Sequence, residues 1–192
     1  GLFAAAFDQD DRWGSRRFEP TNLTFCKSVF AIDGMLFGIG TGISAKGSYP
    51  DEWFTATNLF QTIISKDNKS LVVNGKEMKK GQEIIIDTQK PAWLVTPATT
   101  GYFIPKGHDK LVIKYEEQST PSSVGMGAEF GQEVAAKAYF NHGVKPEKKG
   151  YQFMVVPATS SGKMEELAKK QEKGELFKVL VAQDSIHVVK YL

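Results

Sequence analysis

Short apolar runs rich in Val, Ile, Phe, Tyr and Thr recur along the 192-residue chain, and Gly, Pro, Asn and Asp separate them. This pattern predicts β-strands joined by turns, because β-branched and aromatic residues fit the pleated backbone and the separating residues favour turns. Alternation is clearest where Leu111, Ile113 and Tyr115 share one face. The predicted strands are Leu2–Phe7, Asn22–Ile32, Met35–Ile43, Thr57–Ile64, Ser70–Val73, Glu83–Asp87, Ala92–Thr96, Gly101–Ile104, Leu111–Gln118, Ala135–His142, Tyr151–Val156, Phe177–Ala182 and Ile186–Tyr191.

Two dipeptides between apolar runs predict tight hairpins. Asp33-Gly34 and Asn74-Gly75 suit the type I′ turn, in which Gly accepts a positive φ. One amphipathic helix is predicted near residues 161–173, with Thr159–Ser161 offering N-caps and Gly174 a stop. Many short strands and one helix favour an all-β fold, a large antiparallel β-sandwich. Two long loops, Ala45–Ala56 and Ser119–Gln132, are candidates for function.

The composition is that of an ordinary globular domain, with 41% hydrophobic and 24% charged residues. We therefore expect residues 1–192 to form a single domain. A net charge of +2 gives no reason to expect nucleic acid as a partner. No apolar run reaches the ~18 residues of a membrane span, so no membrane contact is predicted. The single cysteine, Cys26, excludes an internal disulfide and is interpreted as a small buried hydrophobic residue.

The residues predict no metal or cofactor site. His108, His142 and His187 each lack a second His or Cys at ligand spacing. His108 is interpreted as a solvated turn residue, and His187 as a sheet-face residue. The Gly-rich run 38–42 resembles a nucleotide loop only superficially, because no helical pattern follows it. Its glycines predict a bulge or close sheet packing instead.

Several segments together resemble, in chain order, signatures of one enzyme family. They are Lys27–Asp33 with Ile39–Ile43, Thr57–Gln61 followed by Leu71–Gly75, Trp93-Leu94 with Gly101–Ile104, and Tyr139–Pro146 followed by Tyr151–Pro157 and the predicted helix. This series is similar to polysaccharide lyase family eight, which contains chondroitin AC and ABC lyases, hyaluronate lyases and xanthan lyases. The resemblance covers nearly the whole chain.

The resemblance implies the central supersandwich domain of such a lyase, which has a galactose-mutarotase-like fold. The chain is then an internal fragment that packs between an N-terminal α/α toroid and a C-terminal β domain, both absent here. The implied reaction is β-elimination at a uronic acid of an anionic polysaccharide of the chondroitin sulfate or hyaluronan type. We then expect the domain to flank the cleft without being catalytic alone, and the enzyme to be bacterial and extracellular or periplasmic. The resemblance leaves open whether the full enzyme uses a divalent cation.

The resemblance also suggests site residues. The family's ABC-type lyases place a catalytic Glu shortly before the Lys-Ser strand, which points to Glu19, although direct register puts Arg16 there. The cluster Arg12, Trp13, Arg16 and Arg17 suits sulfate or carboxylate groups, with the indole stacking on a sugar.

Two further residues are candidates for binding the polymer. Trp53 in the first long loop is a second stacking residue, and His142 either contacts sugar or anchors a buried turn. The alternatives to a lyase domain are a carbohydrate-binding module and a purely structural sandwich. A sugar epimerase is weaker, because no His/Glu constellation can be assembled from the sequence.

Overall fold

The computed structural model describes residues 1–9, 21–64, 70–119 and 131–192. Within these ranges the chain forms fourteen strands and one helix. The strands are β1 (Leu2–Asp8), β2 (Leu23–Ile32), β3 (Met35–Ala45), β4 (Thr55–Ile63), β5 (Leu71–Val73), β6 (Lys76–Met78), β7 (Gln82–Ile86), β8 (Ala92–Val95), β9 (Gly101–Ile104), β10 (Lys110–Ser119), β11 (Gln132–Gly143), β12 (Lys149–Val156), β13 (Phe177–Gln183) and β14 (Ile186–Tyr191), and the helix is α1 (Ser161–Glu172).

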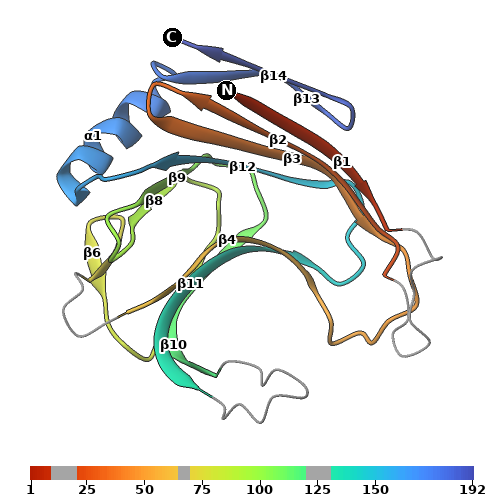
Figure 1. Cartoon of the computed structure of the whole chain (residues 1–192), viewed down its shortest axis with the longest axis horizontal. Coiled ribbons are helices and arrows are strands. Elements are labelled where there is room, and N and C mark those ends of the chain that lie inside the picture. Colours follow the sequence, from red (N-terminus) through yellow and green to blue (C-terminus); the bar gives the residue numbers. More distant parts are fainter. Residues whose placement is uncertain (10–20, 65–69, 120–130) are drawn as a thin grey trace.

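These elements form a layered antiparallel sandwich, which confirms the predicted all-β class. The larger sheet has the order β1-β2-β3-β12-β9-β8-β5-β6, and the smaller sheet has the order β4-β11-β10-β7. A separate two-stranded hairpin pairs β13 with β14. Figure 1 shows the smaller sheet curving across one face of the larger one, with α1 and the hairpin on the opposite side.

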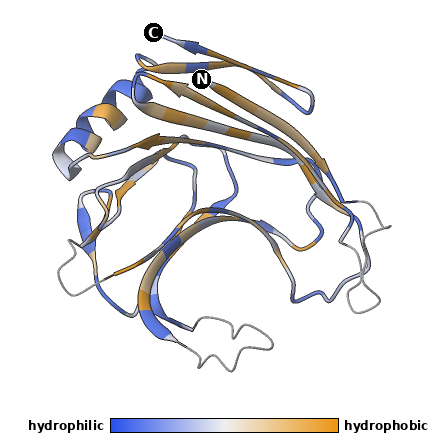
Figure 2. Ribbon diagram, in the orientation of Figure 1, coloured by the Kyte–Doolittle hydropathy of each residue, from blue (hydrophilic) through white to orange (hydrophobic). Residues whose placement is uncertain are grey.

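Two apolar cores lie on the two faces of the larger sheet. The core between the sheets contains Leu111 and Phe140 from the smaller sheet and Tyr151 from β12. The second core places Phe37 of β3 against α1 and Phe177 of β13. Figure 2 shows apolar residues along the strands of both sheets. Because both faces of the larger sheet are buried, its strands need apolar side chains at consecutive positions. This explains the near-continuous run of apolar residues in β9.

A β-bulge in β3 changes which side chains face the inner core. Thr24 pairs with Ser44 and Cys26 with Thr41, so β3 carries one extra residue at this point. Gly42 lies there with φ +64°, a conformation that glycine adopts without strain. Ile39 therefore faces the outer core while Ile43 faces the inner one. The sequence prediction of a bulge in the Gly-rich run is confirmed.

The two predicted hairpin turns are also confirmed. Asp33 and Gly34 have φ of 50° and 72°, and Asn74 and Gly75 have φ of 48° and 80°, as a type I′ turn requires. The second turn connects β5 to β6, a strand that the sequence pattern missed. β6 has only three residues, two of them charged, so it gives no apolar run to detect.

The helix begins and ends as predicted. The Ser160 side chain accepts a hydrogen bond from Lys163 N, and Gly174 follows the helix with φ +71°. Met164 and Ala168 are buried in the second core. One turn of helix spacing thus places both residues against the larger sheet.

Candidate functional site

Five of the residues suggested for the site, Arg12, Trp13, Arg16, Arg17 and Glu19, lie outside the described residues. Their roles remain predictions. Gln9 and Thr21, the described residues that flank residues 10–20, contact each other: the Thr21 hydroxyl donates a hydrogen bond to Gln9 Oε1. In addition, Gly47 N donates to Thr21 O at 3.0 Å. Residues 9 and 21 therefore sit beside the loop that carries Trp53.

This loop and the turn after β11 form what we call the loop end of the sandwich, residues 46–54 and 144–148. Ala45 N donates to Pro146 O at 3.0 Å, and Lys145 N donates to the Tyr49 hydroxyl at 2.9 Å. Tyr49 is thereby held between the two segments. Its ring stacks on Trp53 with 6.4 Å between centroids.

Trp53 is 44% exposed, as a side chain that stacks on a sugar must be. Lys145 Nζ lies 5.6 Å from the centroid of the Tyr49 ring and 3.6 Å from the Asp51 carboxylate. An exposed indole stacked on Tyr49, with a cation beside that tyrosine, is an arrangement that can stack on a sugar ring and attract its anionic groups. Contact with a sugar stays a prediction.

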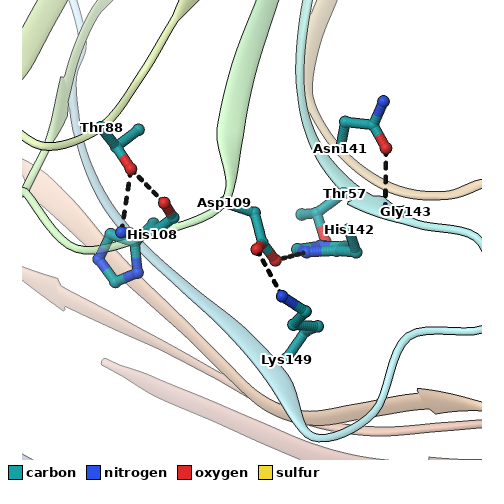
Figure 3. A network of polar contacts seen from close by, with 8 residues as sticks. All are labelled: Thr57, Thr88, His108, Asp109, Asn141, His142, Gly143 and Lys149. Carbon is teal, nitrogen blue, oxygen red and sulfur yellow. Dashed lines mark hydrogen bonds and ion pairs between the residues drawn. The ribbon is translucent and has the colours of Figure 1, made fainter.

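A partly buried polar network, which we call the Asp109 network, joins the two sheets (Figure 3). Asp109, directly before β10, accepts hydrogen bonds from His142 Nδ1 at 2.8 Å and from Lys149 Nζ at 2.9 Å. His142 belongs to β11 of the smaller sheet, whereas Lys149 opens β12 of the larger one. On its other side His142 Nε2 lies 2.9 Å from the Thr57 hydroxyl of β4.

The hydrogen-bond partners define the proton positions in this network. A carboxylate only accepts, so His142 Nδ1 carries the proton toward Asp109. Burial lowers the pKa of His142 and outweighs the opposing effect of Asp109, so the ring is neutral near pH 7 and its Nε2 accepts from Thr57. Burial acts to raise the pKa of Asp109, but the hydrogen bonds from His142 and Lys149 bring it below its usual value. Asp109 is therefore ionised.

The three histidines occupy different surroundings. The His142 side chain has no exposed surface, so the buried turn-anchoring interpretation describes its placement, and sugar contact stays untested. His187 is a sheet-face residue as predicted: its two ring nitrogens lie 2.8 Å from the hydroxyls of Ser28 and Thr41, which attaches β14 to the larger sheet.

Two sequence interpretations are wrong. His108 is not a solvated turn residue, because the turn folds onto the core and places the imidazole edge against Phe140, 6.1 Å between centroids. Its buried Nε2 finds no hydrogen-bond partner among the described residues, and burial lowers its pKa. Cys26 is half-buried rather than buried, because β2 borders an open groove beside the hairpin turn at Asp184.

Sequence reasoning missed the other members of the network that contains His142. Asp109 and Lys149 lie 33 and 7 residues from it along the chain, and Thr57 lies 85 residues away. No spacing rule connects such positions, because strand pairing alone brings them together. Among the described residues no cluster of three or more His, Cys, Asp or Glu side chains can hold a metal ion. None of the described helices is long and apolar enough to cross a membrane.

Comparison with known proteins gives a consistent result. Residues 2–168 match the family model for polysaccharide lyase family 8, super-sandwich domain. The chain is 27% identical over 185 residues to a chondroitin sulfate ABC endolyase of Proteus vulgaris, covering 96% of this chain and 17% of that protein. It thus spans about a sixth of its relative's length.

Solved structures share the fold. A chondroitinase AC lyase superposes with a TM-score of 0.74 at 21% identity, over 98% of this chain and 25% of that one. A Paenibacillus xanthan lyase gives a TM-score of 0.73 at 18% identity, over 98% of this chain and 18% of that one. Because the family model covers most of the chain, this protein belongs to polysaccharide lyase family 8 through its super-sandwich domain.

Proposed function

We propose that this chain is the central sandwich domain of a bacterial lyase that cleaves a glycosaminoglycan of the chondroitin sulfate or hyaluronan type by β-elimination at a uronic acid. The observation that carries the proposal is the family match over residues 2–168, joined to similarity along 96% of the chain to a chondroitin sulfate ABC endolyase. The enzyme is extracellular or periplasmic, where such polymers are met.

Elimination needs a base to remove the proton beside the uronate carboxylate, an acid for the leaving oxygen, and neutralisation of the carboxylate as charge develops. Among the described residues two of the three histidines are held by hydrogen bonds of the fold, and the third, His108, packs against Phe140. His142 is buried in the network with Asp109, and His187 bridges Ser28 and Thr41. We therefore assign the base and acid to an α/α toroid domain elsewhere in the enzyme, and the sandwich flanks the cleft without being catalytic alone.

The loop end is the part of this domain that we place toward the polymer. Trp53 is exposed there and stacks on Tyr49, whose ring also lies 5.6 Å from Lys145 Nζ. Thr21, the first described residue after residues 10–20, bonds to Gly47 of the same loop. The predicted Arg12, Trp13, Arg16 and Arg17 cluster and Glu19 lie within that stretch. In the proposed enzyme the arginines pair with sulfate or carboxylate groups, and Glu19 or Arg16 completes the catalytic group.

The test uses the full-length enzyme and follows the ultraviolet absorbance of unsaturated uronate with chondroitin sulfate and with hyaluronan. Glu19→Ala and Arg16→Ala are compared with Glu147→Ala, an acid in the turn at the loop end. Absorbance growth that collapses in the Glu19 or Arg16 variant alone supports a catalytic contribution from the sandwich. Growth unaffected by either substitution reduces the domain to a scaffold, and no growth on either polymer contradicts the glycosaminoglycan assignment.

The second candidate is a module that binds carbohydrate or has a purely structural role. The exposed Trp53 at the loop end favours the carbohydrate-binding module. The isolated chain then retains chondroitin sulfate in affinity electrophoresis, and Trp53→Ala abolishes the retardation. A lyase domain without its own affinity migrates equally with and without the polymer. A purely structural module is indicated when, in addition, Arg16→Ala and Trp53→Ala leave the full enzyme's activity unchanged.

A further inference from the structure

Three residues lie side by side on neighbouring strands of the larger sheet. Lys27 of β2 pairs with Gly40 of β3, and Gly40 pairs with Tyr151 of β12, so all three face the inner core. Gly40 has no side chain, and the Tyr151 ring lies over it: a Cβ on Gly40 would stand 2.1 Å from Tyr151 Cε1. The ring thus extends across β3 toward Lys27.

A cavity of about 210 Å³ opens beside this row, between the larger sheet and β4. We call it the inter-sheet pocket. Phe25 and Ile43 form apolar walls, and Lys27, Thr57 and Tyr151 supply polar groups. The volume is below the ~300 Å³ at which pockets for drug-sized ligands begin, so the pocket suits one small ring and not an oligosaccharide.

Two polar groups in the inter-sheet pocket have no partner among the residues that the structure describes. Among the described residues none forms an ion pair or hydrogen bond with the Lys27 side chain, and no carboxylate lines the pocket. The Tyr151 side chain is buried except at its pocket end, and its hydroxyl has no hydrogen-bond partner within the described part of the chain. An ammonium and a hydroxyl that are free to bond in an apolar-walled pocket suit a ligand with an anionic group and further polar atoms.

The Asp109 network orients a third polar group. Because His142 Nδ1 donates to Asp109, its Nε2 must accept, and the Thr57 hydroxyl is the donor at 2.9 Å. The Thr57 oxygen keeps its lone pairs for the pocket and can accept from a ligand hydroxyl. Lys149, Asp109 and His142 therefore act as positioning residues for an acceptor at the pocket wall.

We propose that the inter-sheet pocket binds one anionic sugar residue. The Lys27 ammonium pairs with its carboxylate or sulfate, the Tyr151 hydroxyl and the Thr57 oxygen bond to ring hydroxyls, and Phe25 packs on its apolar face. The choice of a sugar among small anions rests on the proposed function. The existence of the pocket and of the unpaired Lys27 ammonium does not depend on that function. Carboxylate and sulfate offer the same chemistry to Lys27, and the experiment separates them.

The test is a methyl NMR titration of full-length protein labelled at isoleucine δ1 methyl groups. Ile43 lines the pocket, and Ile39 lies on the opposite face of the same strand as an internal control. The probes are sodium glucuronate, N-acetylgalactosamine 6-sulfate and the neutral methyl glucoside. We expect a saturable shift of the Ile43 methyl with at least one anionic probe, and the probe that causes it identifies the group bound.

Two variants test the contacts. Lys27→Met removes the charge and keeps most of the stem, and we expect its Kd for the binding probe to rise at least about tenfold. Tyr151→Phe removes a hydroxyl that makes no internal hydrogen bond, so the fold is retained and the Kd rises about fivefold. Lys178→Met, on exposed β13 of the other layer, is the matched control and leaves the Kd unchanged.

Each remaining outcome contradicts the pocket assignment. These are no Ile43 shift with either anion, an equal shift with methyl glucoside, or a Kd unchanged in both variants. Lyase activity is measured on the same samples. Cleavage without an Ile43 shift overturns this inference and leaves the proposed function standing. An Ile43 shift without cleavage contradicts the proposed function and leaves the pocket as a binding site for a small anion.

Discussion

The carboxylate of Asp109 holds Nδ1 of His142 at 2.8 Å, although 33 residues separate the two along the chain. The same carboxylate holds Lys149 through its other oxygen at 2.9 Å. Asp109 therefore connects β11 in the smaller sheet to β12 in the larger one, just below the loop end. Residues 144–148 of the loop end connect these two strands directly, so the network holds the base of that segment.

Replacing Asp109 is expected to destabilise the chain more than replacing Lys149. Asp109→Asn leaves buried His142 with an impaired partner, and we expect a loss of about 2–3 kcal/mol in the free energy of unfolding. Lys149 keeps 43% of its side chain exposed, so Lys149→Gln should cost about 1 kcal/mol or less. Urea unfolding of both variants measures the difference. Equal losses would show that Asp109 acts through Lys149 alone.

The chain should lose stability as the pH falls below about 6.5. The pKa of His142 in the fold lies below its ordinary value of 6.5, so the unfolded chain binds this proton more readily. The stabilisation is therefore fully present above pH 6.5 and is lost as the pH falls through the window below it. Asp109, whose pKa is also lowered, adds a second loss in the window below its ordinary value of 3.8.

Thermal unfolding between pH 7.5 and pH 5 measures this effect. His142→Gln, which cannot be protonated, should show a smaller decrease in Tm over that range than the wild type. His108 and His187 also have lowered pKa values and contribute with the same sign, so the variant flattens the profile without making it level. A profile as steep as that of the wild type would exclude His142 as a source.

Gly40→Ala is expected to be strongly destabilising. The added Cβ would stand 2.1 Å from Tyr151 Cε1, which forces the ring away from its place among Phe140, His142 and Phe153. Overpacking of this kind costs about 1–3 kcal/mol. Gly162→Ala is the control, because nothing lies within 4 Å of its Cβ position and alanine favours the helix by up to about 1 kcal/mol. Urea midpoints that fall equally in both variants would contradict the contact.

Trp53→Ala should leave stability nearly unchanged and weaken polymer binding. The indole is 44% exposed and contacts Tyr49 on one face only. We expect the KM of the full-length enzyme for its polymer to rise about tenfold, which corresponds to a loss of about 1.4 kcal/mol of binding free energy, with kcat little changed. Phe54→Ala is the matched control, since Phe54 is equally exposed but stacks on Tyr139 of the smaller sheet. A KM raised equally in both variants would point to a general loss of loop structure.

The sequence by itself determined the strands, the turns and the helix. Asp33-Gly34 and Asn74-Gly75 form the expected left-handed turns, and α1 ends where Gly174 stops it. Such features depend on neighbouring residues, whose φ preferences and hydrophobic period are local properties of the chain. For the same reason β6, which has three residues and little apolar content, escaped prediction.

Only the tertiary structure decided which distant residues meet. Asp109, His142, Lys149 and Thr57 come from four separate segments. Lys27 and Tyr151 line one pocket only because both pair with Gly40 of β3. His108 looked solvated in sequence because nothing local shows that its turn folds onto Phe140. Sheet order and register set these contacts, and both arise from packing the whole chain, because strand pairing joins residues at any sequence separation.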